Sequence, residues 1–186
     1  MVSTQEVIDA IIRALETSNV VTDDASYIDH DPDITTEAIK LPVIQVSPNT
    51  KNRISDENTD FVGLKEGESD STAREVYEAL YALDVTIAAW TAEGSKYSGR
   101  EIQESITEVL FKYETSGMDE PLKKSDGSVI DGIWRFAVQT GEQNDDLNTT
   151  PTLRRWRKTV IVSMSKTFES EEQDTITEAT ENISVN

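Results

Sequence analysis

The sequence contains no cysteine and a single histidine, His30. Without cysteine there is no disulfide scaffold, no thiolate metal site and no cysteine nucleophile. With one histidine, a zinc site built from several histidines is excluded, and a Ser-His-Asp triad has only His30 as its base. None of the eight glycines stands in a phosphate-binding GxGxxG or GxxxxGK[ST] pattern. These absences exclude most of the common arrangements of catalytic residues.

Long apolar runs and basic residues are also scarce. No apolar run approaches the roughly 18–20 residues that a membrane span needs. Residues 1–6 lack the basic start and apolar stretch of a signal peptide, so we expect a soluble protein made in the cytoplasm. Only 17 Lys and Arg oppose 36 Asp and Glu in 186 residues, which gives a net charge of -19. This charge repels nucleic acid and anionic membranes.

The acidic composition has two explanations. Hydrophobic residues make up 36% of the chain, below the roughly 45–50% of soluble domains, and acidic chains of low hydrophobicity are often disordered. Alternatively, the protein is folded and adapted to molar salt, where the screening length shrinks to about 3 Å. The acids are interleaved with apolar positions of clear period, which favours the second explanation. We therefore expect a haloarchaeal setting and a fold that weakens in low salt.

Two segments have the pattern of amphipathic helices. Residues 3–18 begin with Ser3 and Glu6 at capping-box spacing, and residues 98–115 begin in the same way with Ser98 and Glu101. Apolar residues then recur at helical spacing on one face of each segment. In the first helix they are Val7, Ile8, Ile11, Ile12 and Leu15, and in the second they are Ile102, Ile106, Val109, Leu110 and Tyr113.

Several segments between and after the helices have the pattern of strands. Propensity alone leaves 74–92 open between helix and strand, and the alternation of its apolar residues favours a long strand over 76–91. Pro42 must stand at an edge or at the beginning of its strand, because it has no N–H to donate. The predicted strands are 39–46, 53–55, 60–64, 76–91, 133–139 and 153–168, with a turn at 125–128 and polar loops at 22–37 and 140–151.

The order of these elements predicts an α+β fold. Strands in runs separated by single helices are typical of an antiparallel sheet with the helices packed on one face. The segments 53–55 and 60–64 are weaker strand candidates, so two or three strands are expected between the helices. The order is then α-β-β-β-α-β-β, and we see no internal repeat. We expect one domain over 1–168, followed by an acidic tail over 169–186.

The acidic residues around His30 resemble the start of a calcium-binding loop. The match then fails, because Ile34 stands where such a loop needs glycine and Lys40 where it needs glutamate. A solvated acidic loop is the simpler interpretation. Carboxylate pairs occur throughout the chain, so none of them indicates acid–base catalysis. We predict no catalytic residue, no metal site and no cofactor.

One basic cluster interrupts the acidic sequence: Arg154, Arg155, Trp156, Arg157 and Lys158. On a strand, Arg154, Trp156 and Lys158 share one face, and the other two share the opposite face. Arginine and tryptophan are favoured in protein interfaces, and cations beside an aromatic ring also suit nucleic acid. A third interpretation is pairing with this chain's own acids. We favour a subunit interface, because the rest of the chain repels DNA.

The order of elements resembles the tail terminator, or tail completion, proteins of long-tailed phages and their archaeal virus relatives. The resemblance covers about residues 1–168 and rests on order and spacing rather than on a catalytic motif. It is carried by an N-terminal helix, the proline-containing strand Leu41–Val46, the long aromatic strand Tyr77–Trp90, the central helix Ser98–Tyr113 and the closing strands Ile133–Gln139 and Leu153–Phe168.

The resemblance implies a structural role in a virion. Proteins of this family form a hexameric ring that caps the tail tube, ends its growth and offers the surface to which the head connector docks. The implied partners are the chain itself, the tail tube protein, the head–tail connector and double-stranded DNA that passes through the lumen. Six copies at -19 each would carry about -114, a charge that lets DNA slide rather than stick.

A ring of identical subunits needs two complementary patches on each subunit. The basic cluster at 154–158 and the acidic segments 22–37 or 56–70 are the candidates. Another neck component, such as a head-completion or stopper protein, and a tail tube protein remain as alternatives. So do a halophilic enzyme or small-ligand-binding protein built on an α+β sheet, and a cellular acidic adaptor with a disordered tail.

Overall fold

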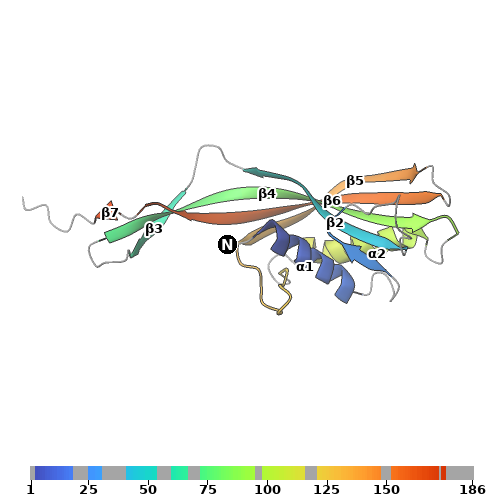
Figure 1. The fold of residues 1–186 in the computed structure, drawn as a ribbon, viewed down its shortest axis with the longest axis horizontal. Coiled ribbons are helices and arrows are strands. Elements are labelled where there is room, and N and C mark those ends of the chain that lie inside the picture. Colours follow the sequence, from blue (N-terminus) through green and yellow to red (C-terminus); the bar gives the residue numbers. More distant parts are fainter. Residues whose placement is uncertain are drawn as a thin grey trace, which may run out of the picture.

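The structure is a computed structural model that describes residues 3–18, 25–30, 41–53, 60–66, 72–94, 98–115, 121–147, 152–171 and 173–174. These residues form two helices and a seven-stranded sheet (Figure 1). In chain order the elements are α1 (Thr4–Thr17), β1 (Ser26–Ile28), β2 (Val43–Arg53), β3 (Asp60–Glu66), β4 (Thr72–Ala92), α2 (Gly99–Thr115), β5 (Ile133–Leu147), β6 (Leu153–Glu169) and β7 (Gln173–Asp174).

Both predicted helices are confirmed, and their first turns show why they begin where they do. Ser3 Oγ accepts a hydrogen bond from the Glu6 backbone N–H at 3.1 Å, and the Ser3 N–H donates to Glu6 Oε2 at 2.8 Å. Ser98 and Glu101 make the same reciprocal pair, each at 3.2 Å. These bonds satisfy backbone donors that have no partner inside the helix.

The sheet confirms the α+β class. Its strand order is β1-β2-β4-β6-β5, with β3 and β7 also paired to β4. Every pair is antiparallel except β1 with β2, which is parallel. The expectation of a wholly antiparallel sheet is therefore wrong at this one edge. The short β1 lies within 22–37, for which the sequence predicts a loop, so that prediction is wrong over Ser26–Ile28.

The largest correction concerns 140–151. Residues 140–147 continue β5 after a register shift between Val138 and Glu142, and Asp145 and Asp146 stand opposite Arg155 and Arg154 of β6. Their polar side chains had indicated a loop. Opposite charges on facing positions of two strands stabilise the pairing. Pairing with the basic segment therefore explains why 140–147 form a strand that their own composition does not predict.

The other strands differ from prediction mainly at their ends. The strand predicted over 39–46 begins at Val43, directly after Pro42, and extends to Arg53. β3, β4 and β6 cover the predicted 60–64, 76–91 and 153–168. The tight turn at 125–128 is confirmed by a hydrogen bond from the Gly127 N–H to the Lys124 carbonyl at 3.0 Å. Residues 54–55 of the predicted strand 53–55 lie outside the described residues.

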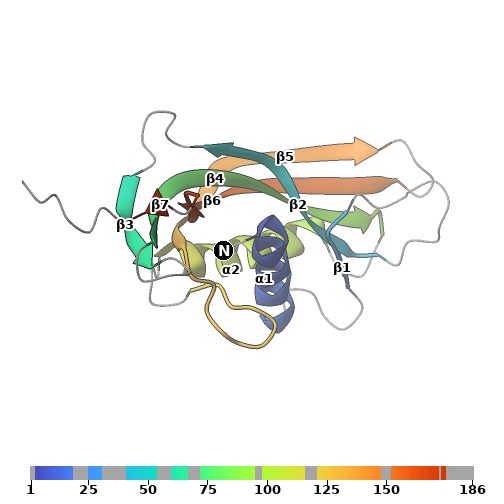
Figure 2. The same ribbon diagram turned by 60° about the vertical axis from the view of Figure 1, so that its left-hand side comes forward.

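The core lies between the sheet and the two helices, which cover the same face (Figure 2). The apolar stripe of each helix and alternate residues of β2, β4 and β6 meet there. Ile8, Leu15, Ile87, Ile106 and Val160 are each at most 1% exposed. Neither described helix has the length and apolar character of a membrane span.

Beyond the helices, β4 and β6 continue into a ribbon that β3 and β7 extend (Figure 1). We call this ribbon the arm and define it as 60–66, 72–78, 167–169 and 173–174; the other described elements form the body. None of the arm's described side chains is buried. Gln173 and Asp174 fall in the segment predicted to be an acidic tail, and 175–186 lie outside the described residues.

Candidate interaction sites

The basic cluster lies at the start of β6, and the predicted alternation is found. Trp156 and Lys158 point to the helix side of the sheet and are only 3% and 4% exposed. Trp156 belongs to the main hydrophobic core. Arg154 is more than half exposed, and it forms ion pairs with Asp146 at 3.4 Å and Glu93 at 3.9 Å. Trp156 and Lys158 are therefore positioned as interior residues rather than as contact residues for a partner.

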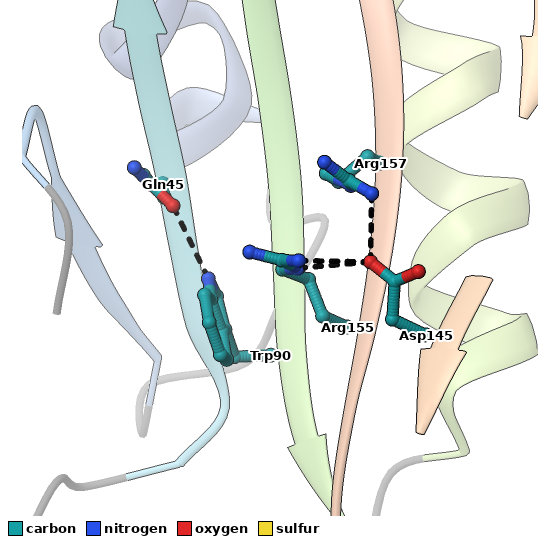
Figure 3. A network of polar contacts seen from close by, with 5 residues as sticks. All are labelled: Gln45, Trp90, Asp145, Arg155 and Arg157. Atoms are coloured by element: carbon teal, nitrogen blue, oxygen red, sulfur yellow. Dashed lines mark hydrogen bonds and ion pairs between the residues drawn. The ribbon is translucent and has the colours of Figure 1, made fainter. Parts of the chain in front are cut away.

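Arg155 and Arg157 point to the opposite, helix-free side and share one carboxylate (Figure 3). Asp145 Oδ2 accepts bonds from Arg155 Nη2 at 2.9 Å, Arg155 Nε at 3.2 Å and Arg157 Nη2 at 2.8 Å. The hydrogen bond from Arg155, followed by the charges of both guanidinium groups, holds the pKa of Asp145 below its ordinary value. The basic cluster therefore pairs in part with acids of its own chain, which was one of the three interpretations of its sequence.

A small second cluster of buried residues fixes Arg155 in place. The Arg155 guanidinium lies over the Trp90 ring, 5.1 Å from its centroid. Trp90 packs with Val43 and Ala88 on the helix-free side. Its Nε1–H donates to Gln45 Oε1 at 3.3 Å (Figure 3). A cation over an indole ring is favourable, so Arg155 is held by the Trp90 ring as well as by the Asp145 carboxylate.

Next to this network the helix-free face has a depression of about 480 Å³. We call it the arginine depression. It lies over β2, β4 and β6, and Arg155 and Arg157 line it together with His30, Gln45, Ser47 and Thr86. Sequence reasoning found the two arginines but not their neighbours, because Gln45 and Ser47 come from a strand more than 100 positions earlier.

The arm supplies a different kind of surface, which sequence reasoning did not single out. Val62 and Leu64 of β3 are 57% and 67% exposed. In the adjoining part of the body, Trp134 at the start of β5 is 45% exposed and lines a shallow depression of about 400 Å³ with Leu80 and Ile133. The sequence does carry a signal for this surface, because Phe61, Val62 and Leu64 stand at both odd and even positions of the strand. Apolar residues on both faces of a strand cannot all pack against one core.

The remaining candidates are weaker or lie elsewhere. His30 pairs with Asp29 at 3.0 Å, and 31–33 of the calcium-like motif lie outside the described residues. Most of the proposed acidic patches, 22–37 and 56–70, lie outside them as well. Within the described ranges, no group of three or more metal-ligating side chains is placed to hold an ion.

A second hollow, of about 550 Å³, lies between α1 and the turn that follows α2. It is lined by both signs of charge, including Glu6, Arg13 and Lys124. Arg13 Nη1 donates to the Lys124 carbonyl at 2.7 Å, and Lys124 Nζ lies 3.2 Å from Glu6 Oε1. These bonds connect the turn to α1, so the charged residues that line the hollow have a structural role.

Comparison with known proteins adds no relative to this picture. No model of a protein family matches the chain, and a search of curated proteins returns no match.

Proposed function

We propose that this protein is a virion structural component that forms a ring at the head-proximal end of a viral tail tube. In this role it ends tube growth and joins the tail to the head connector, and DNA passes through the lumen. The proposal rests on the order of elements that resembles the tail terminator family, and on the arm. The protein acts by assembly and performs no chemical reaction in this role.

The arm is the observation that carries the proposal. A ribbon that projects from the body without covering helices leaves apolar side chains in water, and contiguous exposed apolar residues usually mark a contact surface. Within the described part of the chain, β3 is paired only to β4, so its outer edge offers backbone N–H and C=O groups for pairing with another strand. Val62 and Leu64 lie on this edge strand. A second copy of the chain is the partner that a ring requires.

The structure changes the choice of interface residues within this proposal. Arg155 and Arg157 are bonded to Asp145 of their own chain. Reversing their charge would place a carboxylate beside Asp145 and disturb the fold before it tested assembly. The arm offers a cleaner test, because the exposed side chains of Val62 and Leu64 support no core.

The first experiment measures mass by light scattering in multi-molar KCl and again in low salt. We expect a species of about 124 kDa, six times 20.7 kDa, in high salt. A double variant Val62→Ser/Leu64→Ser should reduce it to the monomer. Val129→Ser is the matched control, because Val129 is 43% exposed but lies in the body. A wild-type protein that is monomeric at every salt and protein concentration would contradict self-assembly.

A second experiment separates the terminator from its neighbours in the neck. The protein is mixed with purified tail tubes of the same virus and examined by negative-stain electron microscopy. A ring added at one end of each tube supports the terminator role. Polymerisation into new tube supports a tube protein, and attachment only to the portal side of filled heads supports a head-completion or stopper protein.

A further inference from the structure

The arginine depression concentrates positive charge on an acidic protein. Among the described residues no aspartate or glutamate lines it, whereas Arg155 and Arg157 both do. Asp145, which bonds to both guanidinium groups, neutralises one of the two charges. This spot therefore keeps about one positive charge in a chain whose net charge is -19. An anion would find here a local attraction that the rest of the surface opposes.

The hydrogen bonds among the described residues do not use all the donors at this spot. Three bonds reach Asp145, all to the same oxygen, Oδ2. Arg157 contributes only Nη2 to them. Its Nε is shielded from solvent and has no hydrogen-bond partner among the described residues. A guanidinium offers more N–H groups than these bonds occupy.

The donors are also held in place before any ligand binds. Arg155 is fixed between Trp90 and Asp145. Gln45 is only 4% exposed and accepts a hydrogen bond from the Trp90 Nε1–H. The amide Nε2 of Gln45 lies 3.5 Å from Ser47 Oγ. The amide, the Ser47 hydroxyl and the Thr86 hydroxyl border the same depression. A site whose groups are already ordered loses less conformational freedom on binding.

From this geometry we infer that the arginine depression binds an oxyanion, a carboxylate or phosphate group, with Arg157 as its principal donor and Arg155 beside it. Planar guanidinium groups match the two oxygens of such ligands. Hydroxyl and amide donors at the border suit the remaining oxygens. The inference concerns the helix-free face of the body and is independent of the assembly through the arm.

Two sources can supply this oxyanion. One is an acidic side chain of a second copy of the chain, and the other is a free phosphate or carboxylate in solution. The test probes the shared chemistry first and the source second.

The first arm titrates the labelled wild-type protein with inorganic phosphate, at constant ionic strength made up with chloride. NMR follows the arginine Nε–H signals. We expect saturable shifts of the Arg155 and Arg157 signals and none of the Arg100 signal. Arg100 is the internal control, because it lies on an exposed helix face, where it pairs with Glu104 at 2.8 Å. Shifts that are absent, or that follow Arg100 without saturation, would overturn the inference.

The variant Arg157→Lys keeps the charge and removes the planar fork. It should weaken phosphate binding about tenfold, while Arg100→Lys should leave it unchanged. Backbone spectra check that each variant is folded. Equal affinity in wild type and Arg157→Lys would remove Arg157 from the site and overturn the assignment.

The second arm repeats light scattering on the wild type with saturating phosphate. If the natural occupant is a carboxylate of a second copy, phosphate displaces it and the mass falls toward 20.7 kDa. If the occupant is a free anion, the mass is unchanged while the NMR shifts remain. Both results support the oxyanion site and name its source. Loss of the 124 kDa species in the Val62/Leu64 variant tests the arm separately.

Discussion

The body and the arm are built from the same two strands, yet only the body has a core. Along β4, side chains are half-buried from Thr72 to Glu78 and mostly buried from Val85 to Thr91. β6 shows the reverse gradient along its own direction. Strand-forming sequence is present throughout, so propensity does not explain the difference. The helices do, because they cover one part of the sheet and end before the other.

The comparison teaches that a ladder of hydrogen bonds is enough to extend a strand but not to bury it. In the arm, order comes from backbone pairing and a few polar contacts. Glu169 binds Lys65 at 2.7 Å and lies 3.7 Å from Arg74, and Lys166 at the base of the arm lies over the Phe168 ring. Such exposed contacts contribute little each, so the arm depends on its connection to the body.

The largest effect should come from opening the body's core. Ile87 is fully buried between the sheet and the helices. Ile87→Ala should lower the free energy of unfolding by about 2–5 kcal/mol, because it removes buried methyl groups and leaves a cavity. The matched change in the arm, Leu64→Ala, should alter it by less than about 0.5 kcal/mol. Urea unfolding followed by circular dichroism measures both, and equal losses would contradict the division into body and arm.

Hydrogen exchange should show the same division within single strands. In the Val62→Ser/Leu64→Ser variant, which should be monomeric, amides of β4 between Val85 and Trp90 should exchange about a hundredfold more slowly than those between Thr72 and Glu78, because opening the arm exposes no core. Mass spectrometry of peptides from β4 measures the ratio. In the assembled wild type the ratio should be smaller, because a second copy covers the arm. Uniform protection along β4 in the monomeric variant would contradict the division into body and arm.

A smaller effect is expected from acid, and it involves one carboxylate in each region. Hydrogen bonding from Lys65 holds the pKa of Glu169 below its ordinary value, as Arg155 does for Asp145. Each pKa is lower in the folded state, so each contribution to stability is complete above the unfolded-state value near 4 and is lost as pH falls through the folded value. Stability should therefore decline below about pH 4.5.

Two variants separate the regions. Glu169→Gln should remove the acid dependence of amide exchange in the arm, and Asp145→Asn that of the β5–β6 edge of the body, with each variant leaving the other region unchanged. The effect should shrink in molar KCl, since both pairs are partly exposed and are screened. An acid response that neither variant alters would assign it to other carboxylates.

The sequence predicts the elements whose signal is local. The capping boxes of Ser3 and Ser98, the apolar stripes behind them and the alternation over 153–168 all depend on neighbours within a few positions. The strand over 140–147 and the three residues of β1 could not be predicted in this way. Each depends on pairing with a partner strand. The partner of 142–147 is the basic segment, for which a subunit interface was the favoured interpretation.

The same limit applies to the candidate sites. Alternation along β6 correctly divided the basic cluster between the two faces of the strand. It did not show which of the two faces packs against the core. Trp156 and Lys158 therefore stood among the interface candidates although they are buried. Asp145 was missed because it lay in an expected loop. Its pairing with Arg155 and Arg157 needed the register of two strands.

The continuity of β4 has a mechanical consequence. One strand of 21 residues is bonded to β2 and β3 on one side and to β6 and β7 on the other. Antiparallel hydrogen bonds lie perpendicular to the strands, so a pull along the arm loads many of them in shear at the same time. A force applied at β3 therefore displaces the whole sheet against the helices, and β4 connects the arm rigidly to the body.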